Sequence, residues 1–130
     1  MSWATYKTAI VNVLESTYSL TEIPENKKAD EVSMATNKNS YQLQWIGASG
    51  IVRYTNNTRQ YNHRVKLQVR FLNINSADRH TNAQTFLNLL QSLHQLSGFA
   101  GFMTEPTFED IDNKHTKAEV EFIIGTEVMA

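Results

Sequence analysis

The sequence predicts one α+β domain in which a mainly antiparallel β-sheet packs against two α-helices, in the order helix, strands, helix, strands. Apolar residues recur at intervals of three and four near the start of the chain and again after residue 80, which indicates two amphipathic helices. Elsewhere apolar and polar residues alternate, which indicates strands with one buried face. A length of 130 residues, 41% hydrophobic and 19% charged, suits a single globular domain over 1–130.

The first helix is predicted to begin after Ser2, whose hydroxyl can cap it. Its buried stripe consists of Trp3, Tyr6, Ile10, Val13, Leu14 and Thr17. The following stretch, at about 21–40, is polar, contains Pro24 and shows no clear period, so we predict a long loop with at most a short extended piece. Because burial of its charged side chains is unfavourable, we expect this loop to be mobile in an isolated subunit and to become ordered against a neighbour.

Two or three antiparallel strands are predicted next, at 40–47, 51–55 and 63–75, with the stretch GASG at 47–50 as a hairpin turn between the first two stretches. The last of these strands is the longest, and its two faces differ in chemistry. One face carries Val65, Leu67, Val69 and Phe71, and the other carries Arg64, Lys66, Gln68 and Arg70. At its far end Leu72 and Ile74 replace the basic residues, so we expect the strand to be covered on both faces there.

The second helix has two candidate caps, Ser76 and Thr81, the latter with Gln84 in capping-box spacing. Its apolar stripe consists of Phe86, Leu89, Leu90, Leu93 and Leu96, and Gly98 is placed to end it in a left-handed conformation. Short strands are predicted at 99–103 and 106–112, and a closing strand at 117–128. The predicted core contains Tyr6, Ile10, Leu14, Val65, Leu67, Val69, Phe71, Phe86, Leu90 and Leu93.

Several kinds of chemistry are not predicted. The chain has no cysteine, which excludes disulfides, thiolate catalysis and cysteine-ligated metals. The four histidines do not have the spacing of a helix-borne zinc site, and the sequence contains no nucleophile elbow, P-loop or dinucleotide fingerprint. The acidic stretch FEDID at 108–112 lacks the ligand loop of an EF-hand. We therefore predict a protein that is not an enzyme and that binds no cofactor or metal.

Membrane association is not predicted either. The start of the chain lacks a basic segment followed by an apolar run, and no stretch reaches the roughly 18 apolar residues that cross a bilayer. We expect an untargeted protein of the cytosol without a membrane partner.

Charge is distributed unevenly along the chain. Residues 53–80 carry six cationic side chains and one carboxylate, whereas residues 81–130 carry two cationic side chains and seven carboxylates. Two interpretations stay open: neighbouring strands of one sheet neutralise each other, or a basic face and an acidic face of different subunits meet. In the second interpretation the candidate interface residues are Arg53, Arg59, Arg64, Lys66, Arg70, Glu119 and Glu121.

An alternative function is a module that binds single-stranded nucleic acid. The basic strand face could follow a phosphate backbone while Tyr54 and Tyr61 stack on bases. About four cations would share that face, and the whole chain has a net charge of -1, so the electrostatic attraction would be weak.

The stretch RVKLQVRFLNINSADR at 64–79 places a strand directly before a leucine-rich helix. Together with the amphipathic first helix, the long polar loop and the final pair of strands, it makes the chain similar to the tail terminator proteins of long-tailed bacteriophages. Related tail-completion, neck and head-completion proteins look similar. The resemblance covers nearly the whole chain and rests on the order of the elements and on the junction at 73–79.

This resemblance implies a structural virion protein without covalent chemistry. It implies a ring of identical subunits, commonly a hexamer, which docks on the last ring of the tail tube, halts its polymerisation and presents a surface to the head-side connector. The implied partners are other copies of the chain, the tail tube protein and the connector, with nucleic acid present only as the passing genome. The implied location is the tail or neck of the virion, and the host cytoplasm during assembly.

Overall fold

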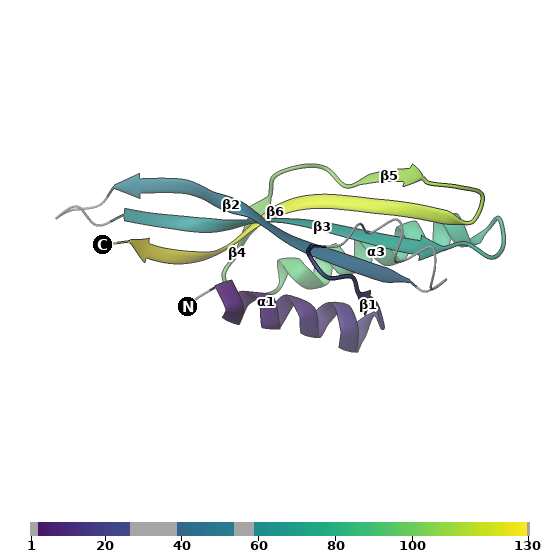
Figure 1. Cartoon of the computed structure of the whole chain (residues 1–130), viewed down its shortest axis with the longest axis horizontal. Coiled ribbons are helices and arrows are strands. Elements are labelled where there is room, and N and C mark those ends of the chain that lie inside the picture. Colours follow the sequence, from purple (N-terminus) through teal and green to yellow (C-terminus); the bar gives the residue numbers. More distant parts are fainter. Residues whose placement is uncertain (1–2, 27–38, 54–58, 130) are drawn as a thin grey trace.

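The computed structural model describes residues 3–26, 39–53 and 59–129. The elements are helix α1 (Trp3–Asn12), the π-helical turn η1 (Val13–Thr17), strands β1 (Thr21–Glu22), β2 (Ser40–Arg53) and β3 (Arg59–Leu72), helix α3 (Asp78–His94), and strands β4 (Phe99–Phe102), β5 (Thr107–Asp110) and β6 (His115–Met129) (Figure 1). The predicted α+β class and the order helix, strands, helix, strands are confirmed.

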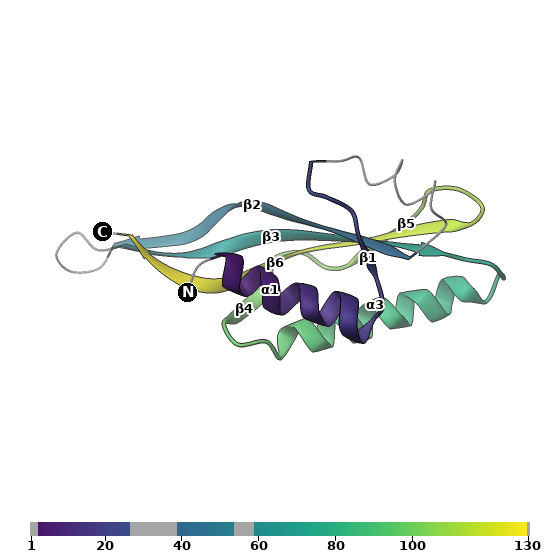
Figure 2. The same cartoon turned by 60° about the horizontal axis from the view of Figure 1, so that its bottom comes forward.

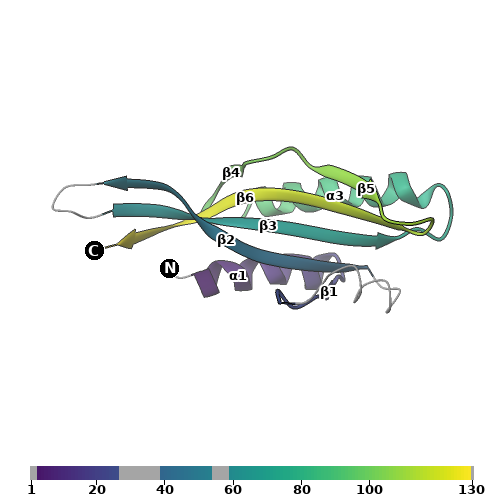
Figure 3. The ribbon, with the colours of Figure 1, turned by 45° about the horizontal axis from the view of Figure 1, so that its top comes forward.

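The strands form one six-stranded sheet with the neighbour order β1-β2-β3-β6-β4. β1 pairs in parallel with the start of β2, and the other pairs are antiparallel. β6 is paired with β3 along one edge; along its other edge it pairs with β5 near its start and with β4 further on (Figure 3). The sheet is therefore built on three long strands, with short strands along its two sides.

Both helices lie on the same face of the sheet (Figure 2). The core fills the space between the sheet and the two helices, because every second residue of the long strands points at the helices. All ten residues of the predicted core are buried there, joined by Leu20, Tyr41, Leu43, Leu89, Ala118, Val120, Phe122 and Ile124. The two apolar stripes and the strand alternation thus predicted the core correctly.

The predicted hairpin turn at GASG is wrong. β2 continues through these four residues, and its register with β3 shifts between Trp45 and Gly47 and again between Ser49 and Val52. Gly47 has a φ of 141°, a conformation that favours glycine. Glycines that suit a turn also suit a bulge, in which the strand bends but continues. The two strands predicted at 40–47 and 51–55 are therefore one strand.

The helix ends differ in part from the prediction. Thr17, predicted in the first buried stripe, is exposed, and Ser2 lies outside the described residues. Neither Ser76 nor Thr81 caps α3, which begins at Asp78. The Asp78 carboxylate instead accepts the N–H groups of Ile74 and Asn75, at 2.9 and 2.8 Å, and so fixes the turn before the helix. Gly98 has the expected left-handed φ of 85°, but α3 has already ended at His94.

The stretch predicted as a loop at 21–40 begins with β1. The backbone N–H groups of Thr21 and Ile23 bond to the carbonyls of Asn39 and Tyr41, at 3.1 and 2.8 Å, so the two ends of the stretch lie beside each other. Ile23 is buried, whereas Glu22 and Glu25 are exposed. The middle of the loop, 27–38, lies outside the described residues, and the expectation that it is mobile stays a prediction.

Candidate functional site

The face of the sheet turned away from the helices, here called the outer face, carries the charged residues singled out from the sequence. Alternation along β3 places Arg64, Lys66, Gln68 and Arg70 on it, and alternation along β6 adds His115, Lys117, Glu119 and Glu121. Lys66 lies directly opposite Glu121, and Gln68 directly opposite Glu119. The basic and the acidic segment of the sequence are therefore neighbouring strands of one sheet.

Ion pairs cross this face within the chain. Arg64 Nη2 lies 2.9 Å from Glu121 Oε1, and Lys66 Nζ lies 3.2 Å from Glu119 Oε1. Gln68 donates a further hydrogen bond of 2.9 Å to Glu119. The network continues through Lys117, whose Nζ lies 3.3 Å from Glu109 on β5. Each carboxylate has a cation within contact distance, so the outer face is close to neutral.

Four of the seven predicted interface residues thus contact one another inside a single subunit: Arg64, Lys66, Glu119 and Glu121. This is the cross-strand neutralisation that the sequence left open as its first interpretation. The side chains of Arg53 and Arg59 lie outside the described part of the chain. A phosphate backbone would have to compete with Glu119 and Glu121 for Arg64 and Lys66, an arrangement that does not favour nucleic-acid binding on this face.

Arg70 differs from the other cations of β3. It was predicted on an open face, yet it is only 3% exposed, and the neighbouring Ser40 and Gln42 of β2 are buried as well. Gln42 Nε2 donates to the carbonyl of Pro24 at 2.9 Å, which places the segment after β1 over this end of the outer face. Burial lowers the pKa of the Arg70 guanidinium, and the charges of Glu109 and Glu119 act against that shift. The expected cover on both faces therefore occurs at Arg70. It does not occur at Ile74, which is 79% exposed and lies beyond the end of β3.

The contrast between two arginines of one strand face gives a testable prediction. Arg70→Ala is expected to lower the free energy of unfolding by about 1–3 kcal/mol, since it removes the packing of a buried side chain and the attraction of its charge to Glu109 and Glu119. Arg64→Ala, which removes a partly solvated ion pair, is expected to cost about 0–1 kcal/mol. Urea unfolding of both variants measures the difference. Equal losses would mean that the cover over Arg70 does not desolvate it.

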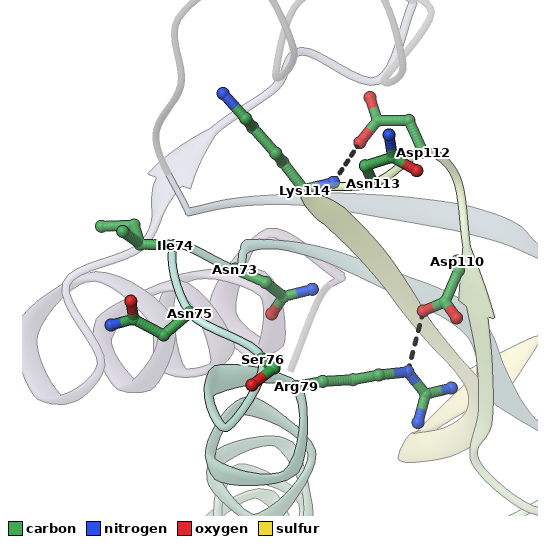
Figure 4. A pocket seen from close by; sticks show the side chains of 9 residues that line it. All are labelled: Asn73, Ile74, Asn75, Ser76, Arg79, Asp110, Asp112, Asn113 and Lys114. Atoms are coloured by element: carbon green, nitrogen blue, oxygen red, sulfur yellow. Dashed lines mark hydrogen bonds and ion pairs between the residues drawn. The ribbon is translucent and has the colours of Figure 1, made fainter.

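A polar hollow lies where β3 runs into α3 and the β5–β6 turn comes alongside (Figure 4). Its volume is about 760 Å³, and its lining residues are Asn73, Ile74, Asn75, Ser76, Arg79, Asp110, Asp112, Asn113 and Lys114. Arg79 Nε lies 2.9 Å from Asp110 Oδ1, so a helix cation holds the end of β5. Asp112 accepts the backbone N–H groups of Lys114 and His115, at 2.7 and 2.9 Å, which shapes the turn. Arg79 and Asp110 thus pair with each other and Asp112 binds backbone N–H groups, so these three side chains fix the junction.

These bonds make the stability of the protein sensitive to acid. The bond from Arg79, followed by that from Thr116, lowers the pKa of Asp110, and the N–H of Lys114 and the ring of His115 lower the pKa of Asp112. A carboxylate whose pKa is lower in the folded chain stabilises the fold above its ordinary pKa of 3.8, and that stabilisation is lost as the pH falls through the lowered value. On acidification below about pH 4, the melting temperature of the double variant Asp110→Asn, Asp112→Asn should therefore fall by less than that of the wild type. A parallel decline of the two melting curves would contradict this assignment.

Two groups of aromatic residues lie near opposite edges of the sheet, on β2 and on β4. On β2, Trp45 donates its indole N–H to Nδ1 of the buried His63 at 3.0 Å. On β4, Phe99 and Phe102 have ring centroids 4.9 Å apart, and the ring of His94 stacks on Phe102 at 6.4 Å. Trp45 and Phe102 remain 42% and 39% exposed. Sequence reasoning placed Trp45 among alternating apolar residues and did not single out Phe102.

Among the residues that the structure describes, no three His, Asp or Glu side chains gather as a metal site requires. Within the same ranges, no helix has the length and hydropathy to cross a membrane. A comparison with models of known protein families found no match, and a comparison with curated proteins found none.

Proposed function

We propose that this protein is a structural virion protein that forms a ring on the end of a phage tail tube, stops the polymerisation of the tube and provides the joint to the head-side connector. The observation that carries the proposal is the arm of the sheet, formed by β2 after Leu43, β3 before Val65 and β6 after Ile124. In Figures 1 and 3 the three strands run side by side past the helices at one end of the sheet.

The apolar side chains of the arm that the structure describes are not part of the buried apolar cluster. The buried apolar cluster includes Tyr41 and Leu43 of β2 and Ile124 of β6, whereas the next described apolar side chains of β2, Trp45 and Ile46, are exposed. At about 3.3 Å per residue, ten further residues of β2 extend the sheet by roughly 33 Å. A stretch of sheet that exposes apolar side chains such as Trp45 and Ile46 is stabilised when another molecule buries them.

Assembly fits this arm better than catalysis or nucleic-acid binding does. The charges of the outer face are neutralised by ion pairs within the chain. In the polar hollow, Arg79, Asp110 and Asp112 bond to other residues that line it. The resemblance of the sequence to tail terminators supplies the kind of assembly: a ring, commonly of six copies, between the tail tube protein and the connector. The proposed location follows, namely the host cytoplasm during assembly and then the neck of the virion.

The proposal is tested by polymerising purified tail tube protein with and without this chain. We expect shorter tubes, each carrying a ring of density at one end in electron micrographs, and a ring mass by light scattering at raised concentration. A monomeric protein that leaves tube length unchanged would contradict the proposal. Binding to the connector alone would point to another neck or head-completion protein. Retention of single-stranded DNA with an affinity that falls steeply with salt would favour the nucleic-acid alternative.

A further inference from the structure

One row of side chains crosses the sheet from edge to edge on its helix-covered face. Trp45 of β2 lies opposite Val65 of β3, Val65 lies opposite Phe122 of β6, and Phe122 lies opposite Phe102 of β4. Directly opposed residues of an antiparallel sheet point to the same face. Val65 and Phe122, in the middle of the row, are fully buried, whereas Trp45 and Phe102, at its two ends, are 42% and 39% exposed.

Each end of the row has a second exposed apolar neighbour. Ile46 follows Trp45 and is 41% exposed, and Met103 follows Phe102 and is 40% exposed. We call Trp45 with Ile46 the β2 edge patch, and Phe102 with Met103 the β4 edge patch. Single apolar residues on a surface are ordinary. Here, however, four of the six large exposed apolar residues in the described part of the chain are the two ends of one row and the residues that follow them in sequence.

The backbone at these two edges is also available for pairing. In the described residues, β1 pairs with β2 only at Ser40 and Tyr41, and no strand lies beyond β4. The carboxylate of Glu25 accepts the N–H of Trp45 at 3.0 Å, so the open edge of β2 begins at Ile46. Open edges of this kind pair with strands of other chains unless they are covered.

We propose that the β4 edge patch of one subunit packs against the β2 edge patch of the next, with β4 continuing the neighbour's sheet beside β2. This inference rests on the proposed function, because it names the joint from which the ring is built. The occupant of each patch is a second copy of this chain: the two patches differ, lie on opposite sides of one subunit and stand at the same level along the strands. A head-to-tail ring requires two such different, matching surfaces.

Strand direction agrees with this joint. β2 is antiparallel to β3, β3 to β6, and β6 to β4, so β4 runs antiparallel to β2. When identical subunits follow one another around an axis roughly along the strands, β4 of one copy meets β2 of the next in antiparallel orientation, which is the more stable pairing. Trp45 and Phe102 would then continue the apolar row across the joint, with aromatic rings as its central contacts.

The joint is tested with two variants that each remove one patch, Trp45→Glu and Phe102→Glu. Each variant alone should remain monomeric by light scattering under conditions in which the wild type forms rings, with self-association weakened more than about tenfold. An equimolar mixture retains one intact joint, between Trp45 of one variant and Phe102 of the other. The mixture should therefore form a dimer and nothing larger. Ile74→Glu, which changes the most exposed apolar residue far from both patches, is the matched control and should form rings.

Other outcomes separate the inference from the proposed function. Rings from both single variants would overturn the joint and leave the proposed function standing. A dimer formed by one variant alone, with no new species on mixing, would replace the head-to-tail joint by a symmetric one. A wild type that neither self-associates nor caps tubes would overturn both. Ile46→Glu and Met103→Glu repeat the test at the neighbouring positions if thermal melting shows that a first variant is unfolded.

Discussion

Gly125→Ala is expected to lower the free energy of unfolding by about 2–6 kcal/mol, through backbone strain and overpacking together. Gly125 lies in β6 with a φ of 79°, in the left-handed region that a residue with a Cβ adopts only under strain. An added Cβ would also overlap the ring of Tyr6, which is a core residue of α1. The ring cannot move away easily, because Gly98 lies against it as well: a Cβ built there would be 2.8 Å from Tyr6 Cε1.

Gly101→Ala is the matched control, since Gly101 lies in the adjacent β4 and a Cβ there meets no atom within 4 Å. Its effect should stay within about 1 kcal/mol. Chemical denaturation of both variants compares the losses. Adding Tyr6→Leu to Gly125→Ala relieves the overlap but not the strain, so the second change should cost less in this background than in the wild type. Additive losses would show that the ring and the glycine do not press on each other.

The period-2 pattern of β3 predicted its two faces because alternation is a local property of an extended chain. Val65, Leu67 and Val69 are in the core as expected, and Arg64 and Lys66 are on the outer face. The burial of Arg70 was not predictable in the same way. Its place in the alternation equals that of Arg64, and the difference comes from the segment after β1, which is distant in sequence and covers one end of the face only.

Glycine patterns were the other source of error. GASG fits a tight turn and a bulge equally well, because both use the conformational freedom of glycine, and the choice depends on whether the neighbouring strand continues alongside. β3 does continue alongside β2, which decides for the bulge. A similar limit applied to the caps of α3, where Asp78 at the helix start bonds backward to Ile74 and Asn75, and neither predicted cap is used.

The candidate joint depends on register, which is the least local property of a sheet. The ion pairs of Arg64 and Lys66 require one register, that of β3 with β6. The row from Trp45 to Phe102 requires three registers at once, those of β2 with β3, β3 with β6, and β6 with β4. The uneven distribution of charge along the sequence was therefore enough to predict the cross-strand ion pairs, but it could not predict the apolar row. The row is indicated in the sequence only by the large aromatic residues Trp45 and Phe102, which lie in stretches predicted as strands.

Phe86→Ala is expected to lower the free energy of unfolding by about 3–5 kcal/mol, through lost apolar burial and the cavity that remains. Phe86 is the fully buried residue of α3 that joins two parts of the sheet. Its ring centroid lies 6.5 Å from that of Phe71 on β3 and 5.7 Å from that of Phe108 on β5, both edge to face. β5 pairs with β6 over four residues only, so this aromatic contact adds to the ion pairs of Glu109 and Asp110 in anchoring it.

The loss should therefore be uneven along the chain. Amide exchange at 107–110 is expected to accelerate more in Phe86→Ala than exchange in the middle of β3, because β5 loses its aromatic contact with α3 while β3 keeps two strand neighbours. Leu87→Ala, one residue further along α3 and 43% exposed, serves as the control and should change stability by about 0.5 kcal/mol or less. A uniform acceleration of exchange would mean that β5 unfolds only together with the whole domain. A small loss of stability would instead place the Phe86 ring outside the core.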